Sequence, residues 1–77
     1  MNPIPLSTVE RGRKVTIADI AGGFGFAKRL SAMGILPGAS VEVVQGSSRG
    51  PVVVRVMESK VVLGRGIARR IMVNETE

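Results

Sequence analysis

Alternation of valine with polar residues most limits what this 77-residue chain can fold into. Within Ser40–Val44 and Val52–Met57, valine occupies every second position, and Glu42 and Arg55 lie on the opposite face of an extended chain. A period of two is typical of a β-strand with one buried face. Shorter apolar runs predict three further strands, at Lys14–Ile17, Lys60–Leu63 and Arg70–Val73. Five short antiparallel strands predict a small β-barrel, whose closure limits exposed strand edges.

One segment has a helical period instead. Phe26, Leu30 and Met33 are spaced i, i+4 and i+7, which predicts a short α-helix over 26–33 with these three side chains on its buried face. Gly34 fits the left-handed residue that ends many helices, and Ile35 can then fold back on Leu30. The helix, which follows the first predicted strand, is therefore expected to stop sharply at Gly34.

Two turns and a tail complete the expected order. Pro37–Gly38 suits the central pair of a type II turn. The segment Gly64–Arg69 is glycine-rich, and we expect at most a single helical turn there. The chain is one domain over 1–77, with an ordered core at about 5–73 and a frayed tail from Asn74.

Composition argues against an enzyme or a metal centre. The chain has no histidine and no cysteine, and its six carboxylates include no clustered pair for general acid–base catalysis. Gly46–Gly50 matches the G-x-S-x-G pattern of hydrolases, but without a histidine base the match predicts only a turn. We therefore expect no catalytic residue, no metal ligand and no cofactor.

The glycine loop before the helix has two readings. Free amides at a helix start attract anions, yet Gly22–Gly25 completes neither the dinucleotide pattern nor the P-loop pattern, and tight backbone geometry is the preferred explanation. Phe24, within this loop, is either an exposed anchor or a plug over one end of the barrel.

Charge and hydropathy suggest a cytoplasmic protein whose positive charge serves to bind nucleic acid, anionic lipid or an acidic protein surface, or simply keeps the surface well solvated. Eleven Lys and Arg against six Asp and Glu give a net charge of +5, without any long basic run. No apolar stretch reaches the roughly 18 to 20 residues that cross a bilayer, so no membrane insertion is expected. Binding of single-stranded nucleic acid normally needs stacking aromatics, and the chain has only Phe24 and Phe26.

The order of these elements resembles the FeoA family. Arg29–Val41 is similar to that family's R-L-x-x-M-G-[IL]-x-x-G-x-x-V signature. Gly50–Val54 matches its G-P-x-x-V pattern, and Ala68–Val73 its closing A-x-x-I-x-V segment. The two glycines in Gly64–Ile67 depart from the helical turn usual there. The resemblance covers about Pro5 to Val73.

The resemblance implies a mainly β, SH3-like barrel with one helix inserted after the first strand. It also implies an accessory role in ferrous-iron uptake, through the cytoplasmic GTP-binding domain of the FeoB membrane transporter. The family's barrel also occurs at the C-terminus of iron-dependent repressors; because no helix-turn-helix precedes the barrel in this chain, a free-standing accessory protein is the expectation.

A docking surface around the helix is the predicted functional site. Phe24 and Leu36 are its expected apolar anchors, and Lys28, Arg29 and Arg49 its basic rim. Leu30, Met33 and Ile35 are assigned to the core instead. Two other functions stay open: a nucleic-acid-binding barrel, and a structural subunit that only oligomerises.

Overall fold

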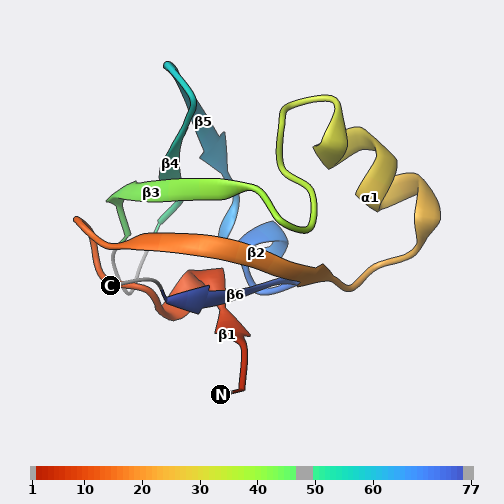
Figure 1. The fold of residues 1–77 in the computed structure, drawn as a ribbon, viewed down its shortest axis with the longest axis horizontal. Helices are drawn as coiled ribbons and strands as arrows, with labels where there is room; N and C mark the ends of the chain where they lie inside the picture. Colours follow the sequence, from red (N-terminus) through yellow and green to blue (C-terminus); the bar gives the residue numbers. More distant parts are fainter. Residues whose placement is uncertain (1, 47–49, 76–77) are drawn as a thin grey trace.

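The computed structural model describes residues 2–46 and 50–75. These residues form one antiparallel sheet of six strands in the order β1-β6-β2-β3-β4-β5, with two short α-helices and one 3₁₀ turn (Figure 1). In chain order, the elements are β1 (Ile4–Pro5), η1 (Leu6–Thr8), β2 (Lys14–Ile20), α1 (Phe24–Ser31), β3 (Ser40–Gln45), β4 (Val52–Val56), β5 (Ser59–Leu63), α2 (Arg65–Ala68) and β6 (Ile71–Glu75).

The sheet curls around a single apolar core, which confirms the mainly β, SH3-like fold. The alternating valines predicted to share a face are all buried, so hydrophobic burial sets the strand faces as the period of two indicated. The buried apolar residues are Leu6, Val9, Val15, Ile17, Leu30, Ile35, Val41, Val43, Val52, Val54, Val56, Leu63, Ala68, Ile71 and Val73.

Several strand limits differ from the prediction. The two-residue strand β1 is additional, so α1 follows the second strand of the sheet rather than the first. Asn74 and Glu75 continue β6 and are not part of a frayed tail. The strand β2 continues to Ile20, past a shift of register against β6 between Ile17 and Asp19. Such an irregularity bends a strand, which helps one long strand to follow the curved sheet.

The helix α1 begins two residues earlier than predicted. Gly23 precedes it with a φ of 93°, and the N–H of Ala27 donates to the Gly23 carbonyl at 3.1 Å. Phe24 is consequently the first helical residue and not part of the glycine loop. Phe26 lies partly buried against the core, and the guanidinium of Arg70 stacks over its ring at 5.4 Å from the ring centre.

The C-terminal end of α1 confirms the predicted glycine stop. Gly34 has a φ of 85°, its N–H donates to Ser31 at 3.0 Å, and the N–H of Ile35 donates to Leu30 at 3.0 Å. This pair of bonds is the Schellman arrangement. A Cβ on Gly34 would lie 2.9 Å from a methyl carbon of Val56, so a side chain there would also collide with the sheet.

Met33 is not in the core, contrary to the prediction. Its side chain is 44% exposed, because α1 ends at Ser31 and the helical period no longer applies at Met33. The chain turns at Gly34, and Ile35 takes the buried place beside Leu30.

The type II turn at Pro37–Gly38 is present. The N–H of Ala39 donates to the Leu36 carbonyl at 2.9 Å, and Gly38 has a φ of 93°. Reciprocal bonds between Ile17 and this turn, from Gly38 to the Ile17 carbonyl and from Ile17 to the Ala39 carbonyl, are both 2.8 Å. The turn that carries Leu36 is therefore fixed to β2.

Among the described residues the barrel stays open between β1 and β5, the two ends of the sheet order. The predicted helical turn, α2, packs near η1 at this opening. Arg65 bridges the two sides, because its Nε donates to the Gly50 carbonyl at 3.1 Å and its Nη1 to the Ser7 carbonyl at 3.3 Å. Charged donors make such bonds stronger than neutral ones.

Candidate docking surface

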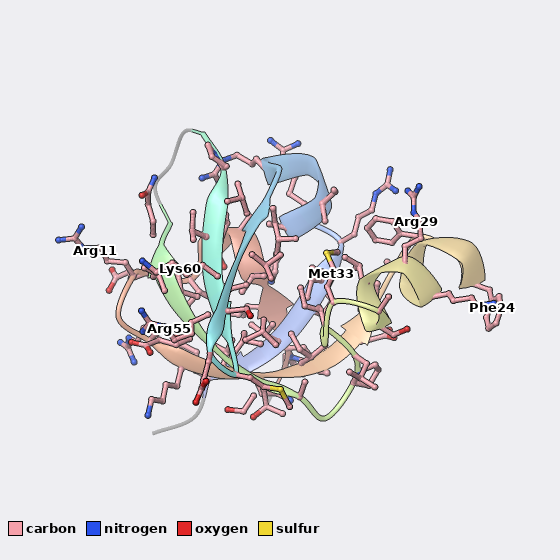
Figure 2. The ribbon with its side chains drawn as sticks, turned by 90° about the horizontal axis from the view of Figure 1, so that it is seen from above. Arg11, Phe24, Arg29, Met33, Arg55 and Lys60 are labelled. Carbon is pink, nitrogen blue, oxygen red and sulfur yellow. The ribbon has the colours of Figure 1, made fainter. Side chains whose placement is uncertain are left out.

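The exposed side chains of α1 begin with Phe24. This residue is 82% exposed and projects from the outer end of the helix, away from the sheet (Figure 2). The structure therefore excludes the alternative in which Phe24 plugs the barrel. An aromatic side chain that a helix exposes to water is available for apolar contact with another molecule.

The predicted basic residues of α1 do not form one cluster with Phe24. Lys28 follows Phe24 by four residues and shares its helical face, whereas Arg29 leaves the helix in a different direction (Figure 2). Both are exposed and lie in the last turn of α1, where their charge is favourable beside the helix C-terminus. Leu36, 43% exposed, lies in the type II turn that follows the helix. Arg49 lies outside the described residues.

We call Phe24, Lys28, Arg29 and Leu36 the helix surface. Its members come from α1 and from the turn after it, and this short stretch of chain presents two exposed apolar side chains with two cations. Such a combination suits a protein surface with an apolar centre and acidic edges.

A second apolar feature went unrecognised in the sequence. A groove of about 560 Å³ lies between the end of α1 and the hairpin of β4 and β5, lined by Ser31, Ala32, Met33, Gly34, Val56, Met57, Ser59 and Val61. We call it the β5 groove. Met57, which the sequence placed at the end of a strand, is instead in the hairpin turn and 89% exposed. Its φ of 58° belongs to a turn position usually given to glycine. The sequence placed the break between the two strands at Glu58 and Ser59, one residue later than the observed turn of Met57 and Glu58.

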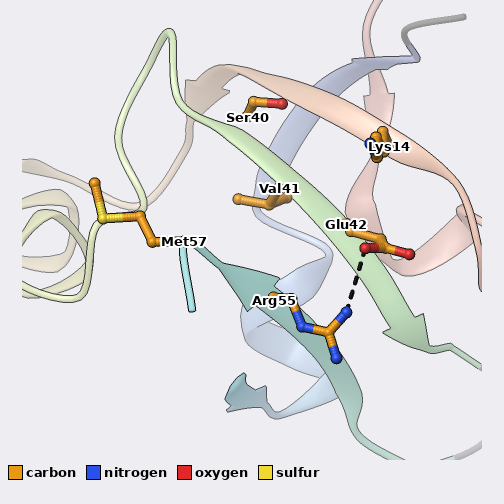
Figure 3. A pocket seen from close by; sticks show the side chains of 6 residues that line it. All are labelled: Lys14, Ser40, Val41, Glu42, Arg55 and Met57. Carbon is orange, nitrogen blue, oxygen red and sulfur yellow. Dashed lines mark hydrogen bonds and ion pairs between the residues drawn. The ribbon is translucent and has the colours of Figure 1, made fainter. Parts of the chain in front are cut away.

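The outer face of the sheet carries a row of charges. Lys14, Glu42, Arg55 and Lys60 are successive cross-strand partners on β2, β3, β4 and β5. Arg55 and Glu42 form an ion pair of 3.4 Å at the edge of a shallow pocket of about 280 Å³ (Figure 3). Both side chains are substantially exposed, so the pair adds little stability. Three cations and one carboxylate leave this row positive.

Within residues 2–46 and 50–75, no three His, Cys, Asp or Glu side chains lie together as metal ligands would, and no helix has the length and apolarity needed to span a membrane.

Comparison with known proteins identifies relatives of the whole chain. The model of the FeoA domain matches residues 4–75. A protein of Methanocaldococcus jannaschii named "Putative Fe(2+) transport protein A" is 36% identical over 73 residues, covering 95% of this chain and 88% of that protein.

Solved structures agree in fold. A crystal structure titled as an iron uptake regulatory protein, FeoA, superposes with a TM-score of 0.87 at 33% identity, covering 99% of this chain and 100% of that chain. A FeoA-like protein from Clostridium acetobutylicum gives 0.83 at 23% identity, covering 100% and 91%. A manganese-dependent transcriptional repressor gives 0.84 at 21% identity, where 96% of this chain matches 37% of the repressor. The last two show a common fold only.

The FeoA family consists of accessory proteins of ferrous-iron transport and is not an enzyme family. The family model spans nearly all of the chain, and a relative above 30% identity covers the same length. This chain therefore belongs to the FeoA domain family.

Proposed function

We propose that the chain is a cytoplasmic accessory protein that binds the GTP-binding domain of a FeoB-type iron transporter through the helix surface and modulates that transporter. Membership of the FeoA family supplies the process, ferrous-iron transport. The observation that carries the binding role is the exposure of two apolar side chains, Phe24 and Leu36, and of two cations, Lys28 and Arg29, along α1 and the turn after it.

Each side chain of the helix surface has a role in this proposal. Phe24 and Leu36 are 82% and 43% exposed, so a partner that covers them gains hydrophobic free energy without first displacing contacts within this protein. Lys28 and Arg29 at the end of α1 steer acidic groups of the partner toward these anchors. Arg49 is part of the proposed basic rim on the basis of the sequence alone.

Leu36→Glu tests this surface. We expect the variant to fold normally, because Leu36 is outside the core, and to lose at least about tenfold in affinity for the isolated GTP-binding domain. Isothermal titration calorimetry with and without guanine nucleotide measures the loss. Ile67→Glu is the matched control, since Ile67 is 36% exposed on α2 and outside the helix surface. Unchanged affinity of a folded Leu36→Glu variant would show that the surface is wrong.

A further inference from the structure

The strand β5 has one free edge, which lies outside the helix surface. The sheet order ends at β5, and no described strand pairs with its second edge. Val56 and Ser59 flank a two-residue turn, so they form a hydrogen-bonded pair, and such pairs alternate along an antiparallel hairpin. Lys60 and Val62 therefore direct their N–H and C=O groups away from β4. An unpaired row of this kind is a template for another extended chain.

The β5 groove lies beside this free edge. Val61 and Ser59 form one wall of the groove, and Met33 and Gly34 at the end of α1 form the opposite wall. Met33 lies between α1 and the sheet (Figure 2). A strand added to β5 would turn every second side chain toward the groove, because successive side chains alternate between faces. The groove therefore offers apolar contact to alternate residues of an occupant.

The charges on β5 and its neighbour β4 indicate which kind of chain can bind at the free edge. Lys60 is directly opposite Arg55 on the outer face, and like charges in that position repel. A carboxylate opposite Lys60 on an added strand would relieve this repulsion. A second copy of the chain would instead bring another protein of net charge +5, with its own Lys60, to the same edge. Lysine on an edge strand is a common means of preventing such self-association.

We propose that β5 and the β5 groove bind an extended acidic segment of a partner protein by strand addition, with apolar residues facing the groove and a carboxylate opposite Lys60. The segment binds through the backbone groups of Lys60 and Val62, and its alternate apolar side chains lie against Met33 and Val61. The inference rests on the proposed function only if the partner is the transporter itself.

A blocked octapeptide of alternating valine and glutamate is the probe. Titrated into the full-length ¹⁵N-labelled protein, it should shift the amide signals of Lys60 and Val62 and slow their hydrogen exchange. The same peptide with its backbone N-methylated at alternate residues should lose at least about tenfold in affinity, because it cannot complete the ladder of hydrogen bonds. A peptide of alternating valine and lysine should bind more weakly than the glutamate peptide.

Two variants of one residue separate strand addition from side-chain contact. Val62→Pro removes the outward N–H at an exposed edge position, where proline is tolerated, and should weaken peptide binding at least about tenfold. Val62→Thr keeps that N–H and should bind as the wild type does. Equal binding by folded Val62→Pro, or by the N-methylated peptide, overturns the proposal, as does a peptide that leaves the Lys60 and Val62 amides unchanged.

The Leu36→Glu variant and the octapeptide together distinguish this inference from the proposed function. If the transporter domain binds the wild type but not Leu36→Glu, and the octapeptide does not bind at β5, the function stands and strand addition is wrong. If the octapeptide protects Lys60 and Val62 while the transporter domain fails to bind, strand addition stands and the partner is a different acidic protein.

Discussion

At the scale of single residues, Met57 combines an exposed side chain with an unfavourable backbone. Among the described residues it alone has a positive φ without being glycine, and its side chain is 89% exposed. The left-handed region costs an L-residue about 1–2 kcal/mol relative to glycine. The fold gains little burial from this side chain, which lines the β5 groove.

Met57→Gly should therefore raise the free energy of unfolding by about 1 kcal/mol, after allowance for the greater entropy of glycine in the unfolded chain. Urea denaturation measures the change. Glu58→Gly is the matched control in the same turn; Glu58 has no positive φ, so that variant should gain no stability. A Met57→Gly protein no more stable than the wild type would contradict the assignment of strain at this position.

At the scale of elements, α1 is held to the rest of the described fold by few buried side chains. Of its eight residues only Leu30 is buried, and Phe26 adds a partly buried ring under Arg70. The strands β2, β3 and β4 each bury at least two side chains and also share ladders of hydrogen bonds. The element that carries the helix surface is thus held by few contacts, and it can open without the sheet.

Amide hydrogen exchange should show this difference. We expect the backbone amides of Lys28 and Arg29, in the last turn of α1, to exchange at least about tenfold faster than those of Ile17 and Val43. The latter two donate to Ala39 and Arg13 at 2.8 and 2.9 Å from buried strands. Binding of the transporter domain to the helix surface should slow exchange in α1. Equal protection of the two sets in the free protein would mean that α1 opens only when the whole domain unfolds.

At the scale of the whole molecule, the distribution of charge over the surface says more about the class of binding partner than the net charge does. The net charge of +5 is spread over α1, the row from Lys14 to Lys60 and the end near α2. Glu42 interrupts that row, and of the two aromatic residues only Phe24 is extensively exposed. Single-strand binders stack successive bases on several aromatic side chains. These features favour separate contacts with acidic protein groups over a continuous track for a phosphate backbone.

We therefore expect no mobility shift of short single-stranded RNA or duplex DNA mixed with the protein at low salt. Binding to the transporter domain should instead weaken as ionic strength rises, because Lys28 and Arg29 act through screened charges. Electrophoresis and calorimetry over the same salt series check both expectations. A nucleic-acid shift that falls steeply with salt would favour the alternative of a nucleic-acid-binding barrel, and a stable multimer in sedimentation that fails to bind the transporter domain would favour the oligomerising subunit.

How much of the site the sequence revealed varies from residue to residue. Leu36 was expected to be exposed because it lies in a turn outside any apolar period, whereas Phe24 was left as either an exposed anchor or a plug; the structure exposes both. Met33 was misassigned, since its spacing from Leu30 is helical but the helix ends first. Met57 was assigned to the preceding strand because it continues an apolar run, and the turn begins one residue earlier than the break expected at Glu58 and Ser59. Whether Phe24, Leu36 and the neighbouring cations bind a partner stays a prediction.

The sequence by itself determined five of the six strands, the faces they bury and the stop of α1 at Gly34. These follow from local causes: a period of two allows only one face to be apolar, and a positive φ costs glycine little. Tertiary structure alone decided that one edge of β5 is left without a described partner strand, that Met33 and Val61 line one groove, and that Lys60 is opposite Arg55. The order of strands depends on pairing between distant segments, and several orders bury the same valines, so the free edge has no signature in the chain.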